Sequence, residues 1–242
     1  MLETPVGLWQ WARMSDVQTF IKEANDLLGP RGFSRDPEML EPWLTDWRGR
    51  FHGQTIGLAS PASTREVSEF VKLCDRYAVP IVPQGGNSGM VGGATPDESG
   101  HSVILSLRRM DDVRSFDVDA RQIVCDAGVI LQNLHETVEQ KGLRFPLTLG
   151  GKGSATVGGL IATNAGGSRV VRFGTMRQQI VGVEAGILDR GSQVLQSFWS
   201  RPDRHSGGHS HKFERRPRTA DRQWWVNHHP ADSQIAVPGC AI

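Results

Sequence analysis

The sequence predicts an α+β fold in which two subdomains each combine helices with a mixed sheet. Two observations lead to this prediction: helical and strand-like segments alternate over residues 15–197, and glycine clusters lie directly beside predicted strands. Glycine accounts for 28 of the 242 residues, about 12% against a usual share of about 7%. The glycines are concentrated in residues 84–100 and 150–174, which indicates particular sites rather than general flexibility.

The regular elements are predicted from the spacing of apolar residues and from helix-capping signals. Three helices are expected, over residues 15–28, 64–77 and 131–141. Five short strands are expected, over residues 56–58, 79–83, 103–107, 113–116 and 122–127. Ser15 and Ser63 are placed to act as N-caps, and Glu66 would complete a capping box with Ser63. His135 is interpreted as a residue on the outer face of its helix.

A first glycine cluster follows the predicted strand 79–83 and has the sequence Pro83-Gln84-Gly85-Gly86-Asn87-Ser88-Gly89-Met90. Backbone N–H groups that converge on a diphosphate can bind this dense anion without many cations. Such a loop must fold tightly and approach its ligand closely, which explains the lack of side chains. A glycine-rich surface turn is the alternative interpretation of this segment alone. A Rossmann loop is not indicated, since the G-x-G-x-x-G pattern is absent and no helix is predicted over 94–100.

A second glycine cluster extends over residues 150–159 and continues through residues 163–167. The two clusters are about 65 residues apart, and each lies beside a predicted strand. This arrangement would suit one elongated ligand held between two subdomains. Lys152 and Arg172 could neutralise its diphosphate, or they could be solvated surface residues.

Composition excludes or disfavours several classes of protein. No run approaches the roughly 18 apolar residues of a membrane-spanning helix. Lys and Arg total 27 and Asp and Glu total 26, so the net charge of +1 gives no sign of a nucleic-acid-binding surface. Cys74 and Cys125 are interpreted as small buried residues, and no metal-type cysteine spacing is present. The first fourteen residues contain no secretory signal, and unpaired cysteines are typical of a reducing compartment. We therefore predict a cytoplasmic location.

The chain changes character near residue 197. Residues 198–242 contain no leucine and five of the eight histidines, whereas residues 1–197 contain 18 leucines. We expect this tail to be disordered and to hold no metal, because it has neither apolar periodicity nor a framework for ligands. The predicted organisation is therefore an N-terminal extension, two subdomains and an aberrant tail, at residues 1–14, 15–110, 111–197 and 198–242.

Several motifs, in this order along the chain, carry a resemblance to a known family. They are LTDWRG, ASPAST, PQGGNSGMVGG, FPLTLGGKGSATVGGLIATNAGG and RFGTMRQQIVGVE. Over about residues 15–184 the chain resembles the FAD-binding domain of the vanillyl-alcohol oxidase/PCMH flavoprotein superfamily. Within this superfamily it is most similar to the D-2-hydroxyacid dehydrogenases, which include D-lactate and D-2-hydroxyglutarate dehydrogenases and the glycolate oxidase D subunit.

The resemblance implies a PCMH-type fold, incomplete at its C-terminus, with FAD held between the two subdomains. It implies that FAD contacts Pro83, Gln84, Gly85, Gly86, Asn87, Ser88, Gly89, Met90, Pro146, Leu147, Ser154, Gly158, Gly159, Asn164, Gly166, Gly167, Arg172 and Gly174. In covalent members of the family a histidine of the first loop bonds the flavin. Asn87 stands in that position here, so we expect FAD to be bound without a covalent bond.

The resemblance also implies an oxidoreductase that transfers a hydride from the α-carbon of a D-2-hydroxy acid to flavin N5. The electrons would pass to an acceptor that the sequence does not identify. No counterpart of the family's substrate domain follows residue 197, so we expect an FAD-binding fragment with little turnover and assign no catalytic residue. Two alternatives remain open: a related FAD oxidoreductase acting on an alcohol or an aldonolactone, and a non-catalytic flavin-binding module.

Overall fold

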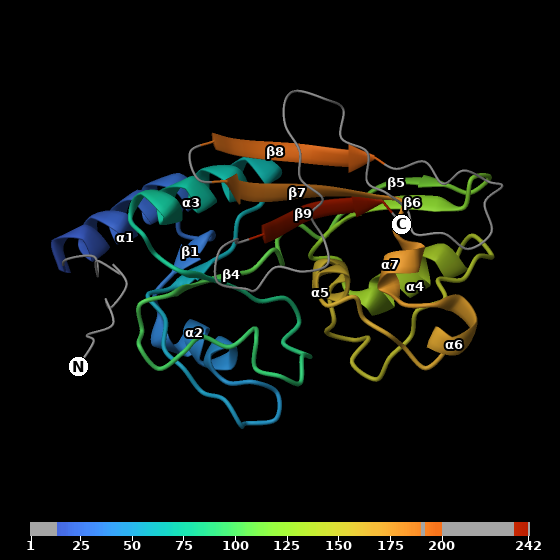
Figure 1. Cartoon of the computed structure of the whole chain (residues 1–242), viewed down its shortest axis with the longest axis horizontal. Helices are drawn as coiled ribbons and strands as arrows, with labels where there is room; N and C mark the ends of the chain where they lie inside the picture. The colour runs from blue at the N-terminus through green and yellow to red at the C-terminus, as the bar shows by residue number, and fades with distance from the viewer. Residues whose placement is uncertain (1–13, 190–191, 200–234, 242) are drawn as a thin grey trace, which may run out of the picture.

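The computed structural model of the protein describes residues 14–189, 192–199 and 235–241. Two lobes lie side by side, and each has its own sheet (Figure 1). Helices cover the sheet of the first lobe on both faces, and the helices of the second lobe gather beneath its sheet. The prediction of an α+β fold is therefore confirmed. The prediction of a mixed sheet in each subdomain is correct for the first lobe and wrong for the second, whose paired strands are all antiparallel.

The first lobe is built around a four-stranded sheet. Its elements are α1 (Met14–Leu28), β1 (Phe33–Ser34), α2 (Pro37–Leu44), β2 (Leu58–Ala59), α3 (Thr64–Arg76), β3 (Ile81–Pro83) and β4 (Val103–Leu105). The strand order is β1-β2-β4-β3; β2, β4 and β3 run parallel, whereas the edge strand β1 is antiparallel to β2. The carboxyl ends of the parallel strands therefore meet at one edge of the sheet, where the first glycine cluster begins.

Successive side chains of a strand point to opposite faces of the sheet, and in these short strands both sets are apolar. Ala59 and Leu105 belong to the core that α1 and α3 cover, in which Phe20 is fully buried. Leu58 and Ile104 point to the opposite face and pack against α2. Helices on both faces keep the sheet out of water and fix the direction in which its loops leave.

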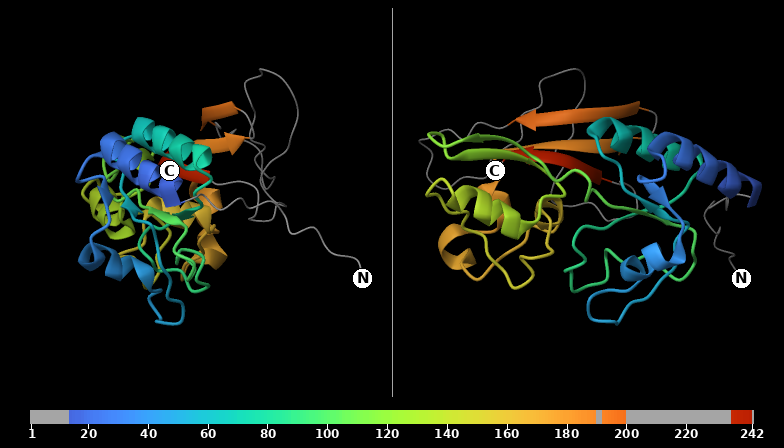
Figure 2. Two further views of the ribbon diagram at one scale, coloured as in Figure 1. Left: turned by 90° about the vertical axis from the view of Figure 1, so that its left-hand side faces the viewer. Right: turned by 180° about the vertical axis from the view of Figure 1, so that it is seen from behind.

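The second lobe contains a five-stranded antiparallel sheet. Its elements are β5 (Val113–Asp117), β6 (Gln122–Asp126), α4 (Leu131–Glu139), α5 (Val157–Ala162), α6 (Val170–Phe173), α7 (Met176–Gln179), β7 (Gly182–Asp189), β8 (Ser192–Trp199) and β9 (Ile235–Ala241). The strand order is β5-β6-β9-β7-β8. The view from behind shows α4 below the sheet (Figure 2, right). Leu131 and Leu134 of α4 and Val157 of α5 are fully buried in the core of this lobe.

All three helices and five strands expected from the sequence are present, with ends shifted by a few residues. Ser63 caps α3 by accepting a hydrogen bond from the backbone N–H of Glu66 at 3.2 Å, as predicted. The Glu66 carboxylate accepts from the backbone N–H of Ala62 at 2.8 Å, one residue before the cap. Because α1 begins at Met14, Ser15 lies inside the helix, and its prediction as an N-cap is wrong.

The sequence analysis missed α2, which lies in a segment rich in polar residues. The helix starts at Pro37, and the carboxylate of Asp36 accepts a hydrogen bond from the backbone N–H of Glu38 at 3.0 Å. Pro42 interrupts the helical pattern at the sequence level, although it lies inside the helix. The Asp36-Pro37 pair could have indicated the start of this helix, because Asp is a good N-cap and Pro is favoured in the first helical turn.

The tail from residue 198 contributes to two strands. Residues 198–199 end β8, and β9 pairs with both β6 and β7 in the middle of the second sheet. The five tail histidines fall within residues 200–234, outside the described residues, so their assignment to a metal-free, disordered segment stays a prediction, as do the subdomain boundaries. In the described part of the chain, no helix combines the length and apolarity that crossing a membrane requires. The same residues contain no group of three or more His, Cys, Asp or Glu placed to hold a metal ion.

Candidate functional site

The first glycine loop leaves the carboxyl end of β3 and is held in shape by two amide side chains. Gln84 is buried, and its Nε2 donates hydrogen bonds to the backbone carbonyls of Trp43 at 2.9 Å and Ala94 at 2.6 Å. Nδ2 of Asn87 donates to the carbonyl of Thr45 at 2.7 Å, and Asn87 has a left-handed φ of 48°. These two side chains therefore hold the loop in shape from behind, and their amide groups are engaged within the chain.

A tight turn after α2 supports the same loop. The carboxylate of Asp46 is buried and accepts hydrogen bonds from the backbone N–H groups of Arg50 at 2.6 Å, Phe51 at 2.8 Å and Arg48 at 3.3 Å. These hydrogen bonds, that from Phe51 above all, lower the pKa of Asp46 below its ordinary value. The ring of Phe51 lies 2.6 Å from the position that a Cβ on Gly92 would take. A side chain at position 92 would therefore have to displace this ring, and the φ of 73° at Gly92 also disfavours one.

The second glycine loop leads into α5 and is fixed to the end of β6. The hydroxyl of Thr156 caps α5 by accepting from the backbone N–H of Gly159 at 3.4 Å. Gly158 donates its backbone N–H to the carbonyl of Ala127 at 2.8 Å, and a Cβ on Gly158 would lie 2.7 Å from the Cβ of Ala127. Glycine at position 158 thus allows the helix to approach the strand closely.

The two glycine loops touch each other where the lobes meet. A Cβ on Gly86 would overlap the carbonyl oxygen of Ser154, and a Cβ on Gly85 would overlap the hydroxyl of Thr156. The Cβ of Ser88 lies 3.3 Å from the position of a Cβ on Gly151. The structure therefore brings the two predicted clusters together, one from each lobe.

Other glycines of the loops face open space. A Cβ on Gly89, Gly93 or Gly150 would meet no atom within 4 Å. Glycine at these positions is not required by packing within the chain. Bare backbone that is both accessible and free of side chains fits a diphosphate, which needs close N–H donors. The residues present thus fit the cofactor that the sequence implied.

A third stretch of predicted site residues runs between α4 and the second loop. The side chain of Leu147 is buried in the core of the second lobe, and its carbonyl oxygen lies 2.8 Å from Nε2 of His135. A Cβ on Gly167 would overlap the carbonyl oxygen of Thr148, which also accepts the backbone N–H of Ser168 at 3.0 Å. The stretch around Leu147 therefore lies directly against residues 167–168.

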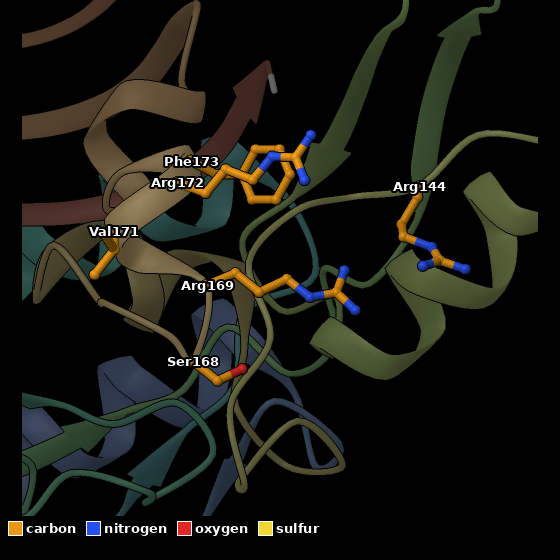
Figure 3. A pocket seen from close by; sticks show the side chains of 6 residues that line it. All are labelled: Arg144, Ser168, Arg169, Val171, Arg172 and Phe173. Carbon is orange, nitrogen blue, oxygen red and sulfur yellow. The ribbon is translucent and has the colours of Figure 1, made fainter.

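A positively charged hollow adjoins this stretch, with a volume of about 580 Å³. It is lined by Arg144, Ser168, Arg169, Val171, Arg172 and Phe173 (Figure 3). Figure 3 shows the side chain of Arg169 extending toward the side of the hollow where Arg144 lies, while the guanidinium of Arg172 lies 5.0 Å from the centre of the Phe173 ring. Arg172 is thus placed at this hollow, and Gly174 ends α6 with a φ of 80°.

Sequence reasoning missed three groups that shape the site. Asp46 organises the turn behind the first loop. The spacing of Asp46 and Gly49 could have indicated this turn, because Asp favours turns and Gly49 adopts the left-handed φ of 65° that the turn needs. Thr156 was included in the second cluster without a role, although it both caps α5 and contacts Gly85. His135 is half-buried and hydrogen-bonded to Leu147, so its interpretation as an outer-face residue is wrong.

Solved structures of other proteins share this fold, and a family model identifies the domain. It resembles alkyldihydroxyacetonephosphate synthase with a TM-score of 0.67 and 19% identity, covering 85% of this chain and 38% of that one. It resembles p-cresol methylhydroxylase with a TM-score of 0.56 and 15% identity, covering 73% of this chain and 34% of that one. Residues 56–194 match the model of the FAD-binding domain family. The chain belongs to this family, as its motifs predicted.

Relatives in sequence are D-2-hydroxyacid dehydrogenases by name. A Schizosaccharomyces pombe protein provisionally named a mitochondrial D-lactate dehydrogenase is 40% identical over 187 residues, which cover 74% of this chain and 35% of that protein. Mitochondrial D-2-hydroxyglutarate dehydrogenases are 41% identical in Arabidopsis thaliana and 44% identical in Bos taurus. Those matches cover 66% and 64% of this chain, and 28% of each relative. The chain thus spans about a third of the length of these relatives.

The names of these relatives contradict the predicted cytoplasmic location. All three are named as mitochondrial proteins. The prediction depended on buried cysteines, and Cys74 and Cys125 are indeed buried without a disulfide. Reduced thiols are equally compatible with the mitochondrial matrix, however, so they could not distinguish the two compartments.

Proposed function

We propose that the chain binds FAD between its two lobes, as the cofactor domain of an oxidoreductase acting on D-2-hydroxy acids. The observation that carries this proposal is the contact between the two glycine loops, one from each lobe, beside accessible bare backbone. The loop contact is made by Gly86 and Ser154, and the open positions include Gly89 and Gly150. Family membership supports the cofactor, and the names of the relatives support the substrate class.

In this proposal the diphosphate lies between the two loops and is held chiefly by the backbone N–H groups of residues 85–90. The N–H groups of Ser154, Val157 and Gly158 already donate within the second lobe, so the second loop contributes close approach rather than donors. Pro146, Leu147 and residues 164–167 line the flavin. When bound, FAD supplies the electron-accepting chemistry of the reaction. The protein's part is to orient the cofactor and to exclude water from the segment around Leu147, whose side chain is 3% exposed.

We further propose that FAD is held without a covalent bond. The side chain of Asn87, which stands where covalent members have histidine, is bonded to the carbonyl of Thr45. An amide is also a poor nucleophile, so it forms no bond to a flavin ring. Precipitating the loaded protein with acid should leave the flavin in the supernatant. Flavin that stays with the precipitated protein would contradict this assignment.

Titration of the purified chain with FAD tests the cofactor proposal. The expected result is a saturable quench of flavin fluorescence, together with yellow protein whose visible absorption bands follow it through gel filtration. A folded protein that stays colourless in excess FAD would overturn the proposal. FMN serves as a matched control, because it carries the same ring but lacks the diphosphate that the two loops bind.

The substrate class requires a separate measurement. Because the chain spans about a third of its relatives, we expect D-lactate or D-2-hydroxyglutarate to bleach the visible bands of the FAD-loaded chain only slowly under anaerobic conditions, and the L-enantiomers not at all. The assay needs no added electron acceptor, because it follows only the reduction of bound flavin. Bleaching by an alcohol or an aldonolactone, but by neither D-2-hydroxy acid, would contradict the proposed class.

A further inference from the structure

The segment from Leu143 to Leu149 connects α4 to the second glycine loop without forming a helix or a strand. Such a segment is not held in place by a continuous ladder of backbone hydrogen bonds. Leu147 anchors it on one side by burying its side chain in the core of the second lobe. On the other side, the carbonyl of Leu147 faces the imidazole of His135 at 2.8 Å.

His135 is itself fixed from two directions. It lies on α4, whose Leu131, Leu134 and Val138 are buried in the core of the lobe. Its ring also packs against Phe145, with the ring centroids 6.1 Å apart and the planes inclined at 53°. A rigid helix therefore presents an imidazole N–H to one carbonyl of an otherwise irregular segment.

We propose that His135 is a positioning residue for the flavin, acting through its hydrogen bond to the carbonyl of Leu147. The inference rests on the proposed function, in which Pro146 and Leu147 form part of the flavin-lining wall. Shifting this wall changes the surroundings of the isoalloxazine ring without removing any group that touches it. His135 is not a general base in this role, because its Nε2 is already engaged by the carbonyl.

The chemistry of the bond suggests suitable variants. A carbonyl oxygen only accepts, so Nε2 of His135 carries the proton, and it does so in both the neutral and the charged imidazole. Glutamine at position 135 supplies an N–H of similar reach. Leucine keeps much of the apolar bulk but donates nothing, and asparagine donates but is too short. These three variants therefore separate the effect of the hydrogen-bond donor from the effect of side-chain packing at position 135.

The test compares His135→Leu, His135→Asn and His135→Gln with the wild-type chain, measuring the FAD dissociation constant and the visible spectrum of bound flavin. We expect His135→Leu and His135→Asn to weaken FAD binding by about tenfold, the effect of losing one partly buried hydrogen bond, and to change the fine structure of the flavin bands. His135→Gln should restore both properties. Thr137→Val is the matched control, since it removes a side-chain hydrogen bond on the same helix, from Thr137 to the carbonyl of Asn133.

Wild-type affinity and spectrum in His135→Leu would overturn the inference, as would a failure of His135→Gln to restore them. If His135→Leu does not fold, the comparison of His135→Asn with His135→Gln still tests the inference, because both side chains donate an amide N–H and differ chiefly in reach. Failure of the wild-type chain to bind FAD would instead overturn the proposed function, and this inference with it. Binding by the wild type with no effect of any variant would overturn this inference alone.

Discussion

The backbone of Gly86 lies so close to the carbonyl oxygen of Ser154 that a side chain at position 86 would overlap it. This contact joins the first glycine loop, which leaves β3, to the second, which leads into α5. The glycine at position 86 therefore serves the junction between the lobes. At Gly89, three residues further along, a Cβ would have no atom within 4 Å. Two glycines of one motif thus have different physical roles.

Alanine substitutions should separate these two roles. Gly86→Ala must displace the second loop, so we expect it to destabilise the folded chain by about 1–3 kcal/mol and to weaken FAD binding. Gly89→Ala should leave the stability within about 0.5 kcal/mol of the wild type and weaken FAD binding alone. Thermal unfolding of the apoprotein and FAD titration measure the two effects. An unchanged melting temperature in Gly86→Ala would contradict the contact.

Asp46 should make the stability of the chain depend on pH in the acid range. Its folded pKa lies below the ordinary value of 3.8, chiefly because the backbone N–H of Phe51 stabilises the carboxylate. The stabilisation is therefore fully present above about pH 4 and is lost as the pH falls through the lower, folded pKa. Asp46→Asn should melt below the wild type at pH 6, and the difference should shrink toward pH 3. A difference that is constant over this range would exclude the charge as its cause.

Arg114 should contribute to stability by linking three strands of the second lobe. Its guanidinium donates to the carboxylate of Asp126 at 2.6 Å and to that of Glu184 at 2.9 Å. The side chain of Asp126 is only 10% exposed, so removing its partner leaves a poorly solvated charge. We expect Arg114→Met to lose about 1.5–3 kcal/mol in urea unfolding, the range for hydrogen bonds to charged groups.

A matched control for Arg114 is an exposed ion pair of the first lobe. Lys72 contacts Glu69 at 2.8 Å on the surface of α3. Lys72→Met should change stability by no more than about 0.5 kcal/mol, because solvent screens such a pair. Equal losses in the two variants would show that burial of the Arg114 partners is unimportant.

Cys74 should resist alkylation in the native protein. Burial in the first lobe strongly raises the pKa of its thiol, and the reactive thiolate is therefore scarce near neutral pH. Peptide mapping after iodoacetamide treatment should find Cys74 unmodified in the native chain and fully modified in urea. Rapid labelling of the native chain would mean that the core opens far more readily than its packing indicates.

Local signals explain which elements could be predicted from the sequence. Helix α3 carries its own cap at Ser63 and a regular apolar face, so nothing outside the segment is needed to recognise it. Helix α2 was missed because Pro42 breaks its pattern, and its stability comes from packing Leu40 against the sheet. Strand β9 could not be predicted, because it exists only through pairing with the distant strands β6 and β7.

The candidate site was predictable in its composition but not in its internal contacts. Glycine clusters and their position after strands indicated two phosphate-binding loops, and the loops do meet. The sequence could not distinguish Gly86 from Gly89, since the difference depends on where Ser154 lies in space. For the same reason it could not reveal that His135 reaches Leu147, because the contact depends on the path of an irregular segment.

The position of β9 also determines when the second lobe can become complete. Residues 200–234 separate it from β8, so β6 and β7 emerge during synthesis well before the strand that lies between them. Pairing over such a distance in sequence is slow, and until it occurs both strands offer unpaired backbone to other chains. The nascent protein therefore passes through a period in which aggregation competes with closure of the sheet, and chaperone supply should affect the yield of folded molecules.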